Sequence, residues 1–349
     1  MRLESCLLAI ACLCNFSARA QSSATVSVVE PSRSAAISTG ATTDIFIDGA
    51  LDHKTVDQFK AVLAQRHLTK GTVHLNSKGG SVLAGLELGT LIRNNGLSTN
   101  VGQRNSWGGL PRPGECSSAC PYAFLGGVYR YASKESQIGV HRFSVTGGVE
   151  PNLDMVEVVS AAIANHILNM GADLGLLELM TLEGGDNIRM LSPDELRDLN
   201  VVDNGIREAT WGLFMVNGFV YLKGQQVTAK GAGKMTFHCH DRNLIGFAFY
   251  GAGQEMAAVA ATTKYSIRID DKLYPMQDPM THAKADERFV DIHFPLSKEQ
   301  FSMMAAGNDI GFAFHKPKGP SYYGFLVHVG DEGRTMLLDY AKYCDSREK

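Results

Sequence analysis

Hydrophobic and polar positions follow two different periods along the chain, and the change falls near residue 205. Before it, short β-branched or aromatic runs alternate with longer stretches that place apolar residues every three or four positions. We predict strands at 44–48, 72–76 and 97–101, and helices at 54–67, 82–95 and 153–170. Alternating strands and helices indicate parallel βαβ units, because parallel strands need a crossover connection between them.

Beyond residue 205 the segments are short, aromatic or β-branched, and separated by Gly, Asn, Asp or Pro. They lie at 214–222, 235–240, 244–250, 264–269, 289–294, 310–315 and 323–329. This pattern is typical of all-β domains and predicts a β-rich, sandwich-like C-terminal domain of unknown role over 208–349. The α/β domain then covers 42–207, and a length of 349 residues agrees with about two domains.

The first twenty residues form a separate pattern. Arg2 precedes a short apolar run at 6–14, and Ala18 and Ala20 are the small residues expected before a cut after Ala20. This is the order of a secretory signal peptide, and the run is too short for a permanent membrane span. We therefore expect residues 1–20 to be removed, 21–41 to form a flexible linker, and the mature protein to be exported, periplasmic or secreted, without a stable membrane span.

The charge balance excludes one class of partner. Lys and Arg number 33 against 36 Asp and Glu, and removal of residues 1–20 leaves 31 against 35. A surface that binds phosphate backbones needs an excess of basic residues. The sequence therefore argues against nucleic acid as the main partner.

Export also decides how the cysteines are interpreted, because an oxidising compartment favours disulfides. Cys116, Cys120, Cys239 and Cys344 remain after the signal peptide. Four cysteines allow three pairings, and the layout of the chain favours Cys116–Cys120 and Cys239–Cys344. The first bridge requires a distorted turn, since residues four apart in a regular helix are awkward to bridge. Two buried free thiols are the alternative.

Three short segments carry the residue types that acyl transfer needs. Strand 72–76 breaks into Gly79-Gly80, Ser118 stands where a loop enters a helix, and His141 ends an apolar strand. A Gly-Gly turn leaves backbone amides open to an oxyanion, a hydroxyl can attack, and an imidazole can take its proton. Each residue alone has a commoner structural role, so only their order and spacing make the combination specific.

The same segments carry a resemblance to a known family. Residues 44–48, 75–81, 118–119 with 124–127, and 137–141 resemble the Clp-type caseinolytic proteases, within the wider crotonase-like fold. The resemblance covers about residues 42–205 and extends to exported bacterial Clp-like proteins with a cysteine-flanked serine. It implies a spiral of ββα units, a peptide or protein substrate, and assembly as a homo-oligomer.

Carried over by position, the resemblance makes Ser118 the nucleophile and His141 the general base. The amides of Gly79 and Ala119 would form the oxyanion hole. The family's acid is an aspartate just before the last helix of the domain, and the matching stretch here is 180–188.

That stretch does not fix the third member of a catalytic triad. Asp186 is the first candidate and Glu183 the second, and a dyad with neither stays open. Each carboxylate has the alternative role of a solvated loop residue. Losing the orienting carboxylate can cost on the order of 10⁴ in turnover.

Two further positions bear on substrate binding and two depart from the family. Gly80 and Ser81 would begin the edge along which an extended peptide adds as a strand. Lys78 stands where the family has proline, so the turn loses stiffness. Cys120 follows Ala119 where the family has a small residue, which places sulfur beside the nucleophile.

Together these residues predict an exported serine peptidase that works through an acyl-enzyme, with no cofactor and no metal. The rival is a catalytically inactive Clp-like scaffold that serves as a periplasmic binding module. Acyl-thioester chemistry, as in the crotonases, is disfavoured because an exported protein would not normally meet coenzyme A.

His238 and His240 share one face of a strand, but Cys239 between them is better used in a disulfide, so we predict no zinc site.

Overall fold

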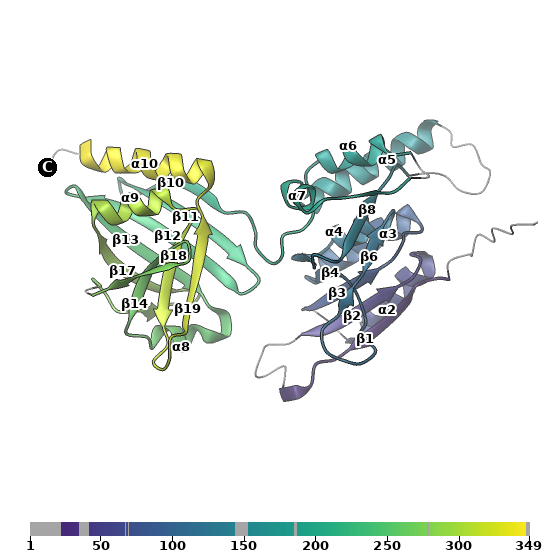
Figure 1. Cartoon of the computed structure of the whole chain (residues 1–349), viewed down its shortest axis with the longest axis horizontal. Helices are drawn as coiled ribbons and strands as arrows, with labels where there is room; N and C mark the ends of the chain where they lie inside the picture. The colour runs from purple at the N-terminus through teal and green to yellow at the C-terminus, as the bar shows by residue number, and fades with distance from the viewer. Residues whose placement is uncertain are drawn as a thin grey trace, which may run out of the picture. The chain divides into compact units, whose positions relative to one another are not determined.

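The chain forms two units. The structure is a computed structural model, and it describes residues 22–34, 42–66, 68, 70–143, 153–184, 187–277 and 279–346. Backbone contacts divide the chain into Met1–Val202 and Asp203–Lys349 (Figure 1). The predicted signal peptide lies outside the described residues. Among the residues that are described, no helix is both long and apolar enough to cross a membrane.

The larger sheet of the first unit contains the three strands predicted from the sequence. In parallel order these are β2 (Thr43–Asp48), β3 (Gly71–Asn76) and β4 (Ser98–Gln103), with β7 (Arg130–Ala132) parallel to β4. β5 (Arg112–Pro113) pairs antiparallel with β4. Central residues of these strands such as Ile45 and Val73 are buried, as expected where helices cover a parallel sheet.

Strand β1 (Thr25–Val29) differs from the sequence prediction, which placed 21–41 in a flexible linker. It pairs antiparallel along the whole of β2, and Ala24 just before it is buried. Val26 and Val28 give β1 the alternation of apolar and polar residues that is typical of a strand. The surrounding stretch is rich in Ser, Ala and Thr, so this short pattern is not recognised from the sequence.

A smaller sheet joins β6 (Glu115–Ser117), β8 (Gln137–Val140) and β9 (Arg189–Met190). β6 and β8 are parallel, and β9 is antiparallel to β8. A further parallel bridge connects Cys116 of β6 to Ser77, just beyond the end of β3. The two sheets therefore meet at the segment that follows β3.

Helices pack on both sheets around one hydrophobic core, which makes the first unit a mixed α/β fold. They are α2 (His53–Arg66), α3 (Val82–Asn94), α4 (Cys120–Leu125), α5 (Leu153–Asn169), α6 (Gly175–Leu182) and α7 (Pro193–Asp198). Two helix-end residues have the geometry typical of their residue types: Gly96 beyond α3 has a φ of +65°, and Ser192 with Glu195 forms a reciprocal capping box at α7.

The second unit is built on two antiparallel sheets. The larger has the order β10 (Thr210–Val216), β11 (Phe219–Thr228), β12 (Gly231–His240), β13 (Asn243–Gly251), β17 (Val290–Leu296) and β16 (Lys284–Ala285). The smaller has the order β15 (Lys272–Met276), β14 (Tyr265–Ile269), β18 (Asp309–His315) and β19 (Tyr322–His328). Buried and half-buried residues alternate along β13 and β17, as expected for strands with one face on the core.

Helices in this unit are not predicted by its pattern of short strands, so the unit is β-rich rather than all-β. A 3₁₀ turn, η1 (Gly253–Glu255), leads into the short α8 (Met256–Ala260), and α9 (Lys298–Ala306) and α10 (Gly330–Ser346) are longer. Ser297 and Gln300 form a capping box at the start of α9. α10 buries Leu337 and Tyr340 against the core, a contact between distant segments that local periodicity does not report.

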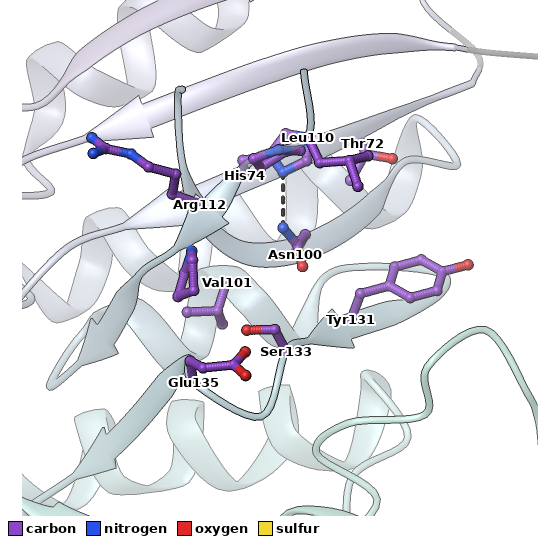
Figure 2. A pocket seen from close by; sticks show the side chains of 11 residues that line it. Thr72, His74, Asn100, Val101, Leu110, Arg112, Tyr131, Ser133 and Glu135 are labelled. Carbon is purple, nitrogen blue, oxygen red and sulfur yellow. Dashed lines mark hydrogen bonds between the residues drawn. The ribbon is translucent and has the colours of Figure 1, made fainter. Parts of the chain in front are cut away.

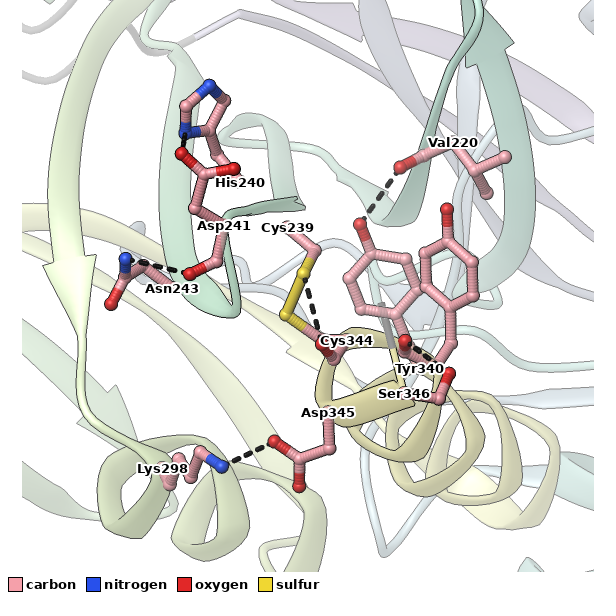
Figure 3. The surroundings of a disulfide bond; sticks show 11 residues. Val220, Cys239, His240, Asp241, Asn243, Lys298, Tyr340, Cys344, Asp345 and Ser346 are labelled. Carbon is pink, nitrogen blue, oxygen red and sulfur yellow. Dashed lines mark hydrogen bonds and ion pairs between the residues drawn. A yellow bond between two sulfur atoms is a disulfide. The ribbon is translucent and has the colours of Figure 1, made fainter. Parts of the chain in front are cut away.

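Two bonds fix α10 to the larger sheet (Figure 3). Cys344 of α10 forms a disulfide with Cys239 of β12 across a separation of 105 residues, and both cysteines are buried. The Tyr340 hydroxyl donates to the Val220 carbonyl of β11 at 2.9 Å. The C-terminal helix is therefore part of the core of this unit.

Replacing Cys239 and Cys344 together with Ala should lower the free energy of unfolding of the second unit by about 2–5 kcal/mol, because the bridge restricts the unfolded chain. Trp211 packs on Gly333 of α10, so its fluorescence during urea unfolding measures the change. A Trp107→Phe background removes the signal of the other tryptophan, which is 93% exposed. An unchanged unfolding midpoint would count against a stabilising role for this bridge.

His166 connects α5 to α4. Its Nε2 lies 2.8 Å from the Tyr122 carbonyl, to which the neutral ring donates. Burial lowers the pKa of His166 and the Arg93 guanidinium acts in the same direction, while the bond to the carbonyl opposes them. The folded unit therefore favours the neutral ring.

The first unit should lose stability as the pH falls from 7 to 5. The unfolded chain binds a proton at His166 below the ordinary pKa of about 6.5 and the folded chain resists it, so the loss grows by up to about 1.4 kcal/mol per pH unit until the lowered pKa is reached. Hydrogen exchange of the α4 and α5 amides measures this loss. The slope should shrink in His166→Gln and persist when the exposed His53 is changed to Gln. Equal slopes in both variants would exclude His166 as the cause.

Candidate active site

Strand β6 brings the predicted site segments together. On one side, the amide of Ser117 donates to the carbonyl of Ser77 at 2.9 Å, and the chain continues from there into Gly79. On the other side, β6 pairs with β8, which ends one residue before His141. Three segments far apart in the sequence therefore meet around Ser118, at one end of the smaller sheet.

Ser118 occupies a strained turn between β6 and α4. Its φ is +61°, in a region that costs a non-glycine residue about 1–3 kcal/mol. Its amide donates to the Gly139 carbonyl of β8 at 3.0 Å, and every residue of the following helix is buried. These contacts hold the turn, which leaves the Ser118 side chain half-buried rather than packed in the core.

The side chains of Ser118 and His141 are in direct contact. Ser118 Oγ lies 2.7 Å from His141 Nε2, and His141 Nδ1 lies 2.8 Å from the Arg142 carbonyl oxygen. A carbonyl only accepts, so Nδ1 carries the ring proton and Nε2 presents its lone pair to the hydroxyl. This is the tautomer that a general base for Ser118 requires.

Glu183, one of the two carboxylates considered from the sequence, makes no side-chain contact with the imidazole in the part of the chain that the structure describes. Glu183 lies nearby through its main chain, where its carbonyl accepts from the Arg142 amide at 3.2 Å. Asp186 lies outside the described residues. The partner of His141 Nδ1 is a backbone carbonyl, a group that has no sequence signature and that sequence reasoning missed.

The backbone of Gly79 lies against the nucleophile. A Cβ built on Gly79 would lie 2.5 Å from Ser118 Cβ, and one built on Gly80 would lie 2.2 Å from the Leu51 carbonyl oxygen. Both glycines also have positive φ, +109° and +139°. Side chains are therefore excluded at both positions, and the main chain comes within reach of the reacting hydroxyl.

The predicted amide donors differ in what they bind. The Gly79 amide donates to Ser77 Oγ at 3.1 Å, whereas the Ala119 amide has no acceptor among the described residues. An oxyanion could bind the Ala119 amide directly but would have to displace the Ser77 bond to use Gly79. The Ser81 hydroxyl accepts from the Ala84 amide as the N-cap of α3, so it is used structurally.

Cys116 of β6 and Cys120 of α4 form a disulfide, and both side chains are 0% exposed. The two residues do not belong to one regular helix, because Cys116 lies in a strand and Cys120 begins the helix. The change from strand to helix supplies the distorted turn that a separation of four residues requires. Ser118 stands at the centre of the loop that the bridge closes.

An apolar cavity of about 410 Å³ adjoins the site, and His141 forms part of its wall. Its other lining residues come from α4, the segment after His141, α5 and α6: Tyr122, Arg142, Phe143, Val156, Ser160, Ile163, Leu177, Met180 and Thr181. Burial raises the pKa of the Tyr122 phenol to about 12, so the Tyr122 side chain stays uncharged. The cavity can accept a bulky apolar group beside the imidazole.

A second cavity, of about 430 Å³, lies beside β3, β4 and β7 (Figure 2). No predicted catalytic or oxyanion residue lines it. Its buried His74 accepts from Asn100 Nδ2 at 3.0 Å through Nδ1 and donates to Asp44 at 2.8 Å through Nε2. The ring also stacks on Phe46 at 4.5 Å. Because both nitrogens are engaged, this histidine has no free lone pair for catalysis.

The cysteine of the 238–240 segment is not available to a metal ion. Cys239 is bonded to Cys344. Within the described ranges, no group of three or more His, Cys, Asp or Glu side chains is placed to hold a metal ion.

Comparison with known proteins finds similarity to solved structures. No family model matches the chain, and no curated protein matches it. Among solved structures, a mutant of the 1510-N membrane-bound stomatin-specific protease is similar over 45% of this chain and 75% of its own, with 19% identity and a TM-score of 0.35. The function of this chain is therefore argued from the geometry of its site.

Proposed function

We propose that this chain is an exported serine peptidase in which a Clp-like domain carries a Ser118–His141 dyad. The observation that carries the proposal is the 2.7 Å contact between Ser118 Oγ and His141 Nε2 in the reactive tautomer. The apolar cavity at the imidazole and the glycine backbone against the hydroxyl support it. Assembly as a homo-oligomer and a spiral of ββα units belong to the same proposal.

The first step forms the acyl-enzyme. Ser118 Oγ bonds to the carbonyl carbon of a peptide, while His141 Nε2 takes the hydroxyl proton. The negative charge moves to the carbonyl oxygen, which the Ala119 amide stabilises together with the Gly79 amide once it leaves Ser77. The imidazolium returns its proton to the leaving nitrogen as the C–N bond breaks.

The second step restores the enzyme. Water takes the place of the released amine, and His141 Nε2 takes a proton from the water as its oxygen bonds to the acyl carbon. The imidazolium then returns this proton to Ser118 Oγ as the ester C–O bond breaks. The extended peptide would lie along Gly80 and Ser81, where β-strand addition holds it through main-chain hydrogen bonds.

Two observations favour a second candidate, an inactive scaffold that binds peptide without cleaving it. The Arg142 carbonyl can orient the imidazole but stabilises its positive charge less than a carboxylate would. The Gly79 amide is also engaged with Ser77. Reaction of the wild-type protein with a fluorophosphonate separates the two candidates, since a scaffold without an activated serine would not be labelled.

Ser118→Ala should abolish labelling by a fluorophosphonate probe, and His141→Gln should slow it by about 10²–10⁴-fold. The first variant removes the nucleophile and the second removes the base. Mass spectrometry of the labelled protein identifies the modified residue.

Ser117→Ala is the matched control, because Ser117 is the neighbouring serine and its hydroxyl donates to Glu115 at 2.8 Å. It should keep wild-type labelling. Circular dichroism verifies the fold of each variant. Full labelling of a folded Ser118→Ala protein would remove Ser118 from the proposed role.

The cavity beside His141 predicts cleavage next to bulky apolar residues such as Phe or Leu. Met180→Trp should fill the cavity and lower the ratio of kcat/KM for Phe over Ala substrates by about 10-fold or more, since a single methylene in a hydrophobic pocket is worth about 1–3 kcal/mol. Fluorogenic peptides that differ only at this position measure the ratio.

Leu182→Trp is the control, because Leu182 lies on the same helix and is 67% exposed. It should leave the Phe over Ala ratio unchanged. An unchanged ratio in Met180→Trp would show that the substrate side chain binds elsewhere.

A further inference from the structure

The Cys116–Cys120 disulfide spans the turn that carries the nucleophile. We propose that it is a positioning device: it holds Ser118 in its left-handed conformation so that the hydroxyl stays in line with His141 throughout the reaction. Cys116 and Cys120 are then positioning residues, which touch neither substrate nor reacting atoms. The inference rests on the proposed function and adds to it how the nucleophile is kept in place.

One end of the bridge is anchored in the strand that organises the site. Cys116 lies at the centre of β6, in register with Ile138 of β8. On its other side, the backbone of Cys116 pairs in parallel with that of Ser77. The sulfur of Cys116 therefore starts from a point fixed on both sides.

The other end is anchored in a buried helix. Cys120 is the first residue of α4, and all residues of that helix are buried. The packing at its start is tight: a Cβ built on Gly85 of α3 would lie 2.4 Å from the Ala119 carbonyl oxygen. With both ends fixed, the bridge limits the backbone of residues 117–119.

The turn needs such a limit because of its conformation. Ser118 has a φ of +61° without being glycine, so relaxation towards negative φ would be downhill for the isolated turn. That rotation would carry Oγ away from His141. Within the described residues, the bond from the Ser118 amide to the Gly139 carbonyl is the backbone hydrogen bond that opposes it at this residue.

The hydrogen bond between Ser118 Oγ and His141 Nε2 cannot hold Ser118 in its left-handed conformation through the reaction. In the proposed cycle that bond is lost when the proton moves and when Oγ becomes acylated. The disulfide persists through every step. Since both cysteines are 0% exposed, solvent thiols do not reach the bridge in the folded state, so it acts as a static constraint.

The chain supplies its own control, the Cys239–Cys344 bridge in the second unit. The experiment compares Cys116→Ala/Cys120→Ala with Cys239→Ala/Cys344→Ala in the full-length protein. For each, fluorophosphonate labelling gives the rate constant per active site and the final labelled fraction. The first pair should lower the rate constant at least 10-fold while the labelled fraction stays near that of the wild type. The second pair should keep the wild-type rate constant.

The two readouts separate positioning from folding. A bridge that only stabilised the fold would lower the labelled fraction and leave the rate constant per site unchanged, and that result would overturn the proposal. A rate constant within twofold of the wild type would overturn it as well. If the Ala pair does not fold, Cys116→Val/Cys120→Ala fills the vacated space with hydrocarbon. Loss of folding in this pair too would make the bridge a folding element and would overturn the proposal.

A measurement that needs no reaction tests this inference independently of the proposed peptidase function. The ¹⁵N shifts of the His141 ring report how fully Nε2 remains the acceptor of the Ser118 hydroxyl, and they can be recorded even if the wild type is not labelled. The first cysteine pair should shift the Nε2 signal towards that of a nitrogen without a hydrogen-bond donor, while Nδ1, held by the Arg142 carbonyl, stays protonated. Absence of labelling in the wild type would reject the proposed peptidase function. Unchanged ring shifts in the cysteine variant would reject the positioning role of the disulfide.

Discussion

The position of β6 between two other chain segments is the constraint on which the site depends. Hydrogen bonds join it to Ser77 on one side and to β8 on the other. Each neighbour continues directly into a functional group, the Gly79 backbone and the His141 imidazole. Since β6 itself runs into Ser118, pairing of backbone groups alone brings nucleophile, base and amides to one point, and the side chains need only adopt their local rotamers.

Burial of the following helix outweighs the strain of this arrangement. The left-handed Ser118 costs about 1–3 kcal/mol. Phe124 and Leu125 of α4 are both 0% exposed, and each fully buried side chain of this kind contributes about 1.5–3 kcal/mol. A turn that relaxed at Ser118 would have to redirect α4 and give up that burial. Burial of α4 therefore offsets the free-energy cost of the left-handed conformation, while the proposed role of the disulfide is to limit motion within the turn.

How far the sequence predicts the structure depends on whether a feature is local. The parallel strands and the caps at Gly96 and Ser192 follow from periodicity and end signals within a few residues. The order of glycine pair, serine and histidine indicates the dyad. The Arg142 carbonyl has no such signal, because any residue supplies a carbonyl and only the folded chain decides which one faces the imidazole. The packing of α10 likewise depends on segments over a hundred residues apart, joined at Cys239 and Cys344.

Two histidines of the first unit show why partners, rather than residue type, decide function. His74 is buried, stacked on Phe46, and uses both ring nitrogens, one towards Asp44 and one towards Asn100. His141 gives one nitrogen to a carbonyl and leaves the other for a hydroxyl. His74 has the carboxylate partner familiar from catalytic triads, yet it has no lone pair to offer. A carboxylate beside an imidazole is therefore neither sufficient for a base nor, where a carbonyl fixes the tautomer, required to orient one.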